Sequence, residues 1–283
     1  MVLSQDCAGY ETTNGRAFLE HIAPHDPAPT EISPVTARLR ALARRALPLS
    51  VRRAVVRCSR WPPIGQVHFG TLRRVEPVSR IWGGDRGLPV DRHYIEAFLS
   101  SHERDIHGHV LEVSDNSYTR RFGGTRVTRS DVLDVARDNL KATIIADLAD
   151  APHVPSDTFD CVICTQTLQY VPDLPSTVKT LHRILRPGGV LLATLPGISQ
   201  TSRHDMERSG DYWRFTDCSA RWLLSRSFRS EDIRVEAFGN VLVAISFLHG
   251  LAAGELRQHE LDYHDPDYQV SITVRAVKTP AAV

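Results

Sequence analysis

Residues 181–197 read LHRILRPGGVLLATLPG, in which a helical pattern is followed by a Gly-Gly turn and then by an apolar strand. Gly188 and Gly189 supply the left-handed turn that lets a helix reverse into a strand. The segment before it, residues 156–173, reads SDTFDCVICTQTLQYVPD and contains a short apolar run at 160–165 that fits a buried strand. A strand, a helix and a second strand in this order predict one unit of a parallel sheet.

The same alternation continues outward along the chain in both directions. Pro89 and Asp91 open a helical pattern, and further helical patterns fall at residues 174–185 and 241–251. The expected strands are residues 109–113, 126–132, 142–148, 160–165, 190–195, 233–238 and 269–277. We therefore predict an α/β fold, with a Rossmann-like, seven-stranded, mostly parallel sheet and helices on both of its faces.

Charge is unevenly distributed along the chain. Its 283 residues carry 34 Lys and Arg against 33 Asp and Glu, but residues 32–75 hold ten Arg and no acidic residue. Basic amphipathic helices are expected at 35–46 and 51–58. We predict an N-terminal extension over residues 1–85, irregular and then helical, before a main domain over 86–283. A packed cover, a partner surface such as a homodimer contact, or part of a substrate site all stay open for the Arg-rich segment.

Several protein classes are excluded by composition. No apolar run approaches the roughly 20 residues that span a bilayer, and the N-terminus lacks the apolar core of a secretory signal, so we expect no membrane span and a cytoplasmic location. Five cysteines, an odd number, do not indicate a disulfide framework. Cys161 and Cys164 lie three apart on an expected strand and so point to opposite faces, which favours buried thiols over a metal or redox pair. We expect no metal site.

Acidic residues follow the expected strands at their carboxyl ends, where an open parallel sheet binds its ligands. Glu112 ends the first strand, Asp131 follows the second and Asp147 ends the third. An acid after the second strand can accept hydrogen bonds from both ribose hydroxyls, and Asp134 would take this place if the strand ran longer. Carboxylates at successive strand ends predict a ligand rich in amines and hydroxyls rather than a pyrophosphate.

These features, in this order, resemble the class I S-adenosylmethionine-dependent methyltransferases, in particular their type 11 branch. The resemblance extends over about residues 86–278 and rests on the segments VLEV (110–113), VTRSD (127–131), ADL (146–148), 156–173 and 181–197. It implies a methyltransferase domain with S-adenosylmethionine as cofactor. The cofactor residues that it implies are Glu112 at the methionine end, Asp131 at the ribose, Asp147 and the Leu148 amide at the adenine, Thr165 and Gln166 under the amino acid portion, and Ser114 and Asn116 in the loop after the first strand. For each acid, a helix cap or a surface charge is the alternative.

One segment departs from the family pattern. The family has Gly-x-Gly-x-Gly after the first strand, whereas this chain has Ser114, Asn116 and Tyr118. Ser is small and Asn tolerates a positive φ, but Tyr118 cannot imitate glycine. We therefore expect a different loop path, with Gly123 and Gly124 supplying flexibility.

The acceptor side of the site is expected in the long polar segment 197–216. Asp211, Tyr212 and Trp213 lie in its DYWRFT stretch, which resembles family members that act on glycosylated natural products and surface sugars. Aromatic faces suit stacking on a sugar ring, and His204, Asp205 and Asp211 can hydrogen-bond its hydroxyls or amines. Alternatively, Trp213 and Phe215 anchor the loop to the core. His204 is the candidate catalytic base because a histidine titrates near neutrality.

Two further parts of the chain are candidates near the acceptor and the cofactor. His249 and His264 are the next histidine candidates for the base, and His249 is also a candidate on the acceptor side. By the resemblance, Arg92 or Tyr94 in the helix before the first strand closes over the methionine carboxylate, with core packing as the alternative for Tyr94.

The predicted function is an O- or N-methyltransferase that acts on a small molecule. The expected acceptor is a sugar-bearing natural product such as an aminoglycoside, in a tailoring step such as antibiotic biosynthesis. Two alternatives stay open: a nucleic-acid methyltransferase that uses the Arg-rich segment to contact phosphates, and a binding protein with the same fold but without catalysis.

Overall fold

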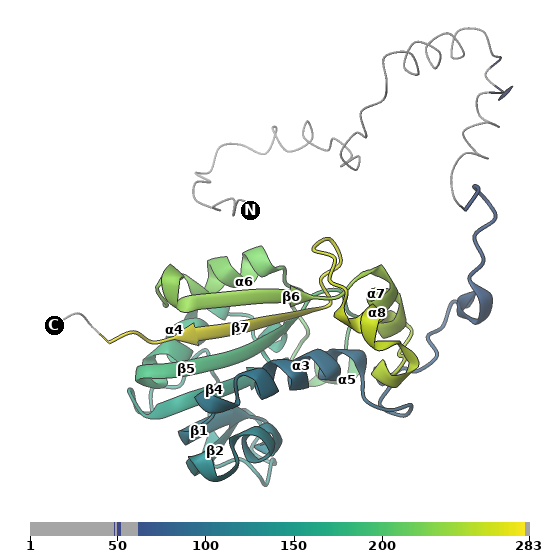
Figure 1. The fold of residues 1–283 in the computed structure, drawn as a ribbon. Coiled ribbons are helices and arrows are strands. Elements are labelled where there is room, and N and C mark those ends of the chain that lie inside the picture. Colours follow the sequence, from purple (N-terminus) through teal and green to yellow (C-terminus); the bar gives the residue numbers. More distant parts are fainter. Residues whose placement is uncertain (1–47, 49, 52–61, 281–283) are drawn as a thin grey trace, which may run out of the picture. The chain divides into compact units, whose positions relative to one another are not determined.

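The computed structural model describes residues 48, 50–51 and 62–280 (Figure 1). The chain divides into two compact units, residues 1–74 and 75–283, and the sheet lies entirely in the second. The basic helix expected at 35–46 and most of the one expected at 51–58 lie outside the described residues. The domain boundary between residues 85 and 86 stays a prediction.

The core of the second unit is a seven-stranded sheet in the order β3-β2-β1-β4-β5-β7-β6. Strands β1 to β5 pair in parallel, and β7 pairs antiparallel with both β5 and β6. The strands are β1 Gly108–Val113, β2 Val127–Asp134, β3 Ile144–Ile145, β4 Phe159–Thr165, β5 Leu185–Pro196, β6 Ile233–Phe238 and β7 Ser271–Val277. This confirms the predicted mostly parallel sheet.

Several strands differ in length from the prediction, and the difference is clearest in β5, β2 and β3. Strand β5 has twelve residues and begins directly after α4, instead of spanning only the residues expected at 190–195. Strand β2 continues two residues beyond residue 132, because Leu133 is buried and pairs with Ile144 while Asp134 pairs with Ile145. Strand β3 has only those two residues instead of the seven expected at 142–148. The longer β2 changes which acid stands at its carboxyl end.

Helices cover both faces of the sheet (Figure 1). Helix α3 packs through Ile95, Phe98 and Leu99 on one face, and α4 and α6 pack on the opposite face. Cys161 belongs to the α3 side and Cys164 to the other, which confirms that the two buried thiols point apart. The helices are α3 Val90–Ser101, α4 Leu174–Ile184, α5 Arg203–Arg208, α6 Asp217–Leu224, α7 Val241–Leu248 and α8 Gln258–Asp262.

The helix boundaries follow local chemistry. Asp173 caps α4 by accepting from the backbone N–H of Ser176 at 3.1 Å, and Asn240 caps α7 through Val243 at 3.0 Å. After α4 the chain reverses at Gly188, whose φ of +84° is the left-handed conformation expected there.

The carboxyl ends of β1, β2, β4 and β5 lie at one edge because these strands are parallel. The loops at 114–119, 166–170 and 197–216 therefore leave the sheet on the same side. Among the residues that the structure describes, no helix has both the length and the apolar character needed to cross a bilayer.

Candidate functional site

Glu112 lies in β1, one residue before its end, and its carboxylate holds the following loop. It is 3% exposed, accepts from the backbone N–H of Tyr118 at 3.2 Å, and accepts from both the N–H and the hydroxyl of Thr119 at 2.7 Å. Burial raises the pKa of Glu112 to about 7, although these hydrogen bonds oppose the shift. In this structure Glu112 therefore orders the loop, and its contact with a cofactor stays a prediction.

The loop after β1 uses a non-glycine residue at the tight turn. Ser114 has a φ of +72°, so serine occupies the left-handed conformation where the family has its first glycine. The chain then forms a π-helical turn, Thr119–Gly123, and Gly124 has a φ of +56°. Tyr118 packs with the apolar cluster under α3. Asn116 reaches sideways to the hydroxyl of Ser130, with its Nδ2 at 3.2 Å.

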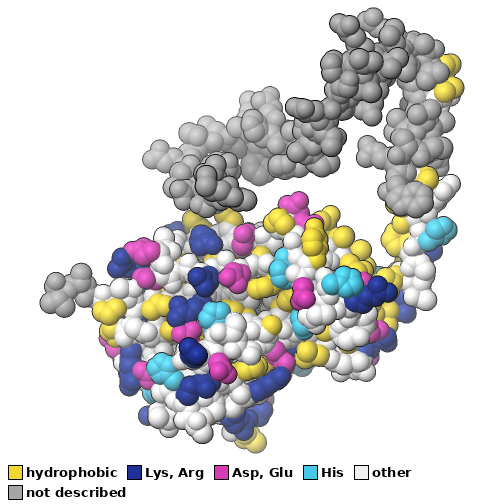
Figure 2. Space-filling model, viewed as in Figure 1, with side chains coloured by type: hydrophobic (Ala, Val, Ile, Leu, Met, Phe, Trp, Pro, Cys, Tyr) yellow, Lys and Arg dark blue, Asp and Glu magenta, His cyan; other side chains and the backbone are white. Residues whose placement is uncertain are grey.

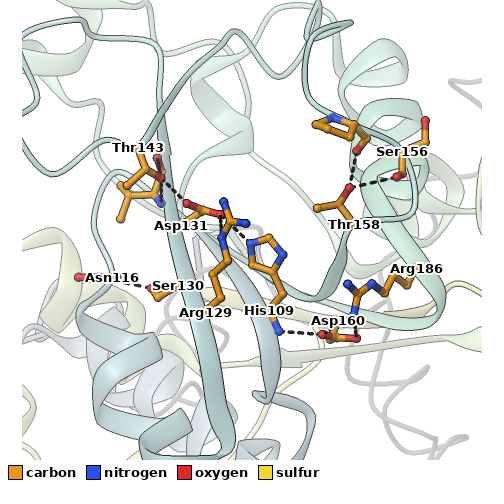
Figure 3. Close-up of polar contacts among 12 residues, drawn as sticks. His109, Asn116, Arg129, Ser130, Asp131, Thr143, Ser156, Thr158, Asp160 and Arg186 are labelled. Atoms are coloured by element: carbon orange, nitrogen blue, oxygen red, sulfur yellow. Dashed lines mark hydrogen bonds and ion pairs between the residues drawn. The ribbon is translucent and has the colours of Figure 1, made fainter.

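Asp131 lies inside β2 in a polar network between strands (Figure 3). Its Oδ2 is 2.6 Å from His109 Nε2 and 3.1 Å from Arg129 Nε, and its Oδ1 accepts from the Thr143 hydroxyl at 2.8 Å. Burial raises the pKa of Asp131, but the hydrogen bonds and the positive charge around it lower the pKa by more. Both carboxylate oxygens are thus engaged by the protein, and Asp131 is 6% exposed.

Asp134, the alternative to Asp131, stands at the carboxyl end of β2. Its Oδ1 accepts from the backbone N–H of Ala136 at 2.9 Å, and its Oδ2 accepts from Asn139 Nδ2 at 2.6 Å. The same Asn139 amide donates to the carbonyl of Ser114 at 2.7 Å, which links the β2 end to the loop after β1. Asp134 thus stands at the strand end whereas Asp131 lies inside β2, which is the case in which Asp134 was expected to take the ribose role, and that role stays a prediction for either acid.

Asp147 follows β3 and is exposed, whereas the neighbouring Leu148 is buried. Its Oδ1 accepts from the backbone N–H of Ala149 at 2.8 Å in a local turn. Both the adenine contact and the turn-forming alternative remain compatible with this position.

A cavity of about 270 Å³ lies beside the ends of β4 and β5. Side chains from the segment before α3, the first turn of α3, the turn after β4, the loop after β5 and helix α7 line it. Its polar lining residues are Asp91, Arg92, Gln166, Gln169, Tyr170, Ser199, Gln200, Ser202, Asp205, Asp211 and Arg214, and its larger apolar ones include Ile81, Trp82 and Phe247. A polar cavity with an aromatic wall next to the strand ends is the strongest candidate for a binding site.

Gln166, one of the predicted cofactor residues, lines this cavity. It follows β4, has a φ of +47° and keeps its Nε2 buried without a hydrogen-bond partner among the described residues. Strained backbone and unsatisfied buried amides are both enriched at ligand sites. Thr165, the last residue of β4, directly precedes Gln166 and pairs with Thr194 on β5.

Arg92 brings a positive charge to the same cavity. Its Nε is 3.9 Å from Asp91 Oδ2, and its Nη1 is 3.4 Å from the Tyr118 hydroxyl, so its contacts within the protein are long. This guanidinium is available to an anionic group. Tyr94, in contrast, is 4% exposed and donates to the carbonyl of Leu261 at 2.9 Å, which is a core position.

The structure separates the two candidate residues His204 and Asp211. Asp211 lines the cavity, where Arg214 binds both of its oxygens at 2.6 and 2.9 Å and the Ser202 N–H donates at 2.9 Å. His204 is exposed on α5, with Nε2 at 3.2 Å from Arg208, and does not line the cavity. The geometry gives the His204 base no support and places the next residue, Asp205, at the cavity instead.

Tyr212, Trp213 and His249 also fall outside the cavity lining. Phe215 is buried in the core, so it anchors the loop as the alternative expected. Trp213 is 40% exposed, and its indole N–H donates to the carbonyl of Val171 at 2.9 Å, so it is held by a hydrogen bond at the surface and not by the core. His249 ends α7, where its carbonyl accepts from the N–H groups of Val78 and Ser79.

Trp82, Gln169 and Tyr170 line the cavity and were not selected from the sequence. Trp82 has a φ of +57° and precedes Gly83. The Trp-Gly-Gly sequence at 82–84 is the one signal that could have indicated a tight turn with an aromatic side chain at this position. Gln169 and Tyr170 lie in the segment QTLQYVPD, where apolar residues stand on either side of them and no motif marks a binding site.

The strand ends supply groups that match an S-adenosylmethionine molecule. Carboxylates of Asp134 and Asp147 suit hydroxyl and amine donors, and the weakly bonded Arg92 suits a carboxylate. The tight turn at Ser114 lets a ligand approach the backbone. The residues present therefore fit this cofactor.

Comparison with known proteins adds independent information. A family model described as a methyltransferase domain matches residues 96–237. The chain is 32% identical over 157 residues to malonyl-[acyl-carrier protein] O-methyltransferase of Serratia marcescens, covering 49% of this chain and 59% of that protein. It is 36% identical over 75 residues to methyltransferase GfsG of Streptomyces halstedii, covering 24% and 27%. The chain thus spans less than two thirds of the length of each of these relatives.

Solved structures with a similar fold include an S-adenosylmethionine-dependent methyltransferase from Mesorhizobium loti. The match has a TM-score of 0.45 and 19% identity, and covers 66% of this chain and 97% of that one.

Proposed function

Because this chain belongs to the methyltransferase domain family, we propose that it transfers a methyl group from S-adenosylmethionine to an oxygen or nitrogen of a sugar-bearing small molecule. The observation that supports this acceptor class is the polar cavity beside the ends of β4 and β5, with its amide, hydroxyl and carboxylate side chains. The expected acceptor is a glycosylated natural product such as an aminoglycoside, methylated in a cytoplasmic tailoring or antibiotic-biosynthesis step.

The cofactor assignment follows the strand ends. Asp134 would accept from the ribose hydroxyls, Asp147 from the adenine amine, and Arg92 would pair with the methionine carboxylate. Gln166, with an unsatisfied Nε2, would lie between the cofactor and the acceptor. When bound, S-adenosylmethionine supplies the electrophilic methyl carbon, so the main tasks of the protein are to position the acceptor and to take its proton.

Trp82 is the cavity's candidate for stacking on a sugar ring, in place of Tyr212 and Trp213. It lines the cavity together with hydrogen-bonding groups, and sugar sites commonly combine an apolar ring face with polar edges.

The test is methyl transfer by the full chain. Labelled S-adenosylmethionine is incubated with a panel of aminoglycosides and amino sugars, and with DNA and RNA in parallel. We expect label on members of the sugar panel. Label on nucleic acid alone would replace this proposal with the nucleic-acid alternative, and label on nothing would favour the binding-protein alternative.

The nucleic-acid alternative depends on the Arg-rich segment 32–75, most of which lies outside the described residues, so this alternative stays open. On the face shown in Figure 2, basic and acidic side chains are interspersed, whereas a nucleic-acid surface gathers positive charge. The homodimer stays a prediction.

A further inference from the structure

Tyr170 and Asp205 form a hydrogen-bonded pair in the wall of the cavity. Tyr170 ends the short turn after β4, and Asp205 lies in the first turn of α5. The Tyr170 hydroxyl donates to Asp205 Oδ2 at 2.8 Å, and both residues line the cavity. Burial raises the pKa of Tyr170, and the hydrogen bond to Asp205 raises it further, so this hydroxyl stays protonated and remains a donor.

Asp205 differs from the other two carboxylates of the cavity in having no cationic partner. Asp211 is bound by Arg214 through two oxygens. Asp91 accepts from the Arg92 backbone N–H at 2.8 Å and faces its guanidinium. Within residues 62–280 no Arg, Lys or His forms an ion pair with Asp205, and no group donates to its Oδ1. Among the described residues Asp205 therefore forms no ion pair and its Oδ1 accepts no hydrogen bond, although the guanidiniums of Arg92 and Arg214 line the same cavity.

Gln169 adds a second hydrogen-bond acceptor to this wall. It is 4% exposed, and its Nε2 donates to the Gln166 carbonyl at 2.9 Å, which leaves Oε1 without a donor among the described residues. Buried acceptors without donors are uncommon in proteins, and a bound ligand or water usually accounts for them. Both features favour a ligand that brings hydrogen-bond donors.

We propose that the Asp205 carboxylate binds a hydroxyl or ammonium group of the acceptor and takes its proton. Tyr170 is the residue that positions Asp205. Acceptors that present a carboxylate at this place are excluded by charge repulsion. This inference rests on the proposed function. For a hydroxyl acceptor, the proton would pass to Asp205 Oδ1 as the oxygen takes the methyl group from S-adenosylmethionine, whose sulfur would keep the electron pair of the broken bond. An ammonium acceptor would give its proton to Asp205 first, because only the neutral amine has a lone pair with which to attack. The proton then leaves to solvent.

The test measures binding before activity. The full chain, saturated with S-adenosylhomocysteine, is tested by thermal shift and calorimetry at up to 10 mM of each probe. Donor-bearing probes are 2-deoxystreptamine, methyl glucosaminide and myo-inositol, and carboxylate probes are glucuronate and malonate. We expect at least one donor-bearing probe to bind and neither carboxylate to do so. Binding by a carboxylate, or by no donor-bearing probe, would overturn the proposal.

Variants then assign the contact. Asp205→Asn is expected to weaken the best probe at least tenfold, and Tyr170→Phe about threefold, while affinity for S-adenosylhomocysteine stays unchanged in both. Asp262→Asn, on the exposed side of α8, is the matched control and should change neither. Unchanged probe affinity in Asp205→Asn contradicts the proposal.

Measuring kcat as a function of pH distinguishes a positioning role of Tyr170 from a purely structural one. With the best probe as acceptor, Tyr170→Phe should shift the pH dependence of kcat, and Asp205→Glu should recover part of the activity that Asp205→Asn loses. An unshifted profile together with no recovery would assign the pair a structural role. If S-adenosylhomocysteine itself fails to bind the wild-type chain, the proposed function fails instead.

Discussion

The middle of β2 and its carboxyl end hold two aspartates three residues apart, and their surroundings differ. Asp131 is enclosed by His109, Arg129 and Thr143 and ties β2 to β1 and to the residues before β3. Asp134 leaves the sheet at the edge where the loops converge and is half-buried. Because ligands bind at the carboxyl ends of parallel strands, we expect the acid at the strand end to contact a ligand and the acid inside the strand to stabilise the fold.

Removing the enclosed acid, Asp131, should cost the most stability. In Asp131→Ala, the His109 imidazole and the Thr143 hydroxyl lose a buried acceptor, so the free energy of unfolding should fall by about 3 kcal/mol. Urea denaturation measures this loss. Asp138→Ala, at an exposed position after β2, is the matched control and should lie within about 0.5 kcal/mol of wild type. A loss below about 1 kcal/mol in Asp131→Ala would show that the network is not structural.

Glu112 combines features of both regions, because it is enclosed like Asp131 but lies next to a strand end. Its pKa of about 7 in the folded protein is above the ordinary value of 4.5. The folded state therefore binds more protons than the unfolded state between these pH values, and stability falls as pH rises through this window. The loss attributable to Glu112 is on the order of 2–3 kcal/mol.

The check on Glu112 is urea denaturation from pH 4.5 to 8. In Glu112→Gln this component of the pH dependence should disappear, whereas Glu207→Gln on the exposed side of α5 should keep the wild-type slope. An unchanged slope in Glu112→Gln would mean that the carboxyl titrates as it does in the unfolded chain.

Asp147 follows β3, the next strand along the chain, and is exposed like a ligand-binding acid at a strand end. Because the side chain is exposed and holds only a local turn, Asp147→Ala should weaken S-adenosylhomocysteine about tenfold, which is about 1.4 kcal/mol, with little change in Tm. Calorimetry and thermal melting are measured on the same samples. A fall in Tm with unchanged affinity would assign Asp147 to the turn alone.

Replacing Trp213, in the loop 197–216, should change stability the least. Trp213→Phe removes the hydrogen bond to the Val171 carbonyl but keeps an aromatic ring, so stability should fall by less than about 1 kcal/mol. Affinity for sugar probes should stay as in wild type. A marked loss of that affinity would return Trp213 to the acceptor site.

The sequence predicted the architecture well because the sheet depends on apolar periodicity and on turn residues. All seven strands were found, and the turn at Gly188 has the expected left-handed backbone. The end of β2 was misplaced because VTRSDVLD contains two acids with one apolar pair between them, and only the pairing of Leu133 with Ile144 decides where the strand stops.

The acceptor side could not be predicted at the level of residues. Whether His204 or Asp205 faces the cavity depends on the rotation of α5, a helix of six residues with no apolar face to define it. Trp82 reaches the cavity from a segment more than 80 residues before β4 ends, so its contribution depends on tertiary packing. Local patterns contain neither kind of information.

The most direct test of the account is calorimetry with S-adenosylhomocysteine on wild type, Asp134→Ala and Asp131→Ala, at a temperature where all three are folded. We predict that wild type binds, that Asp134→Ala binds about thirtyfold more weakly (about 2 kcal/mol), and that Asp131→Ala stays within about threefold of wild type. No binding heat for wild type at millimolar ligand, or a loss in Asp131→Ala with none in Asp134→Ala, would contradict it.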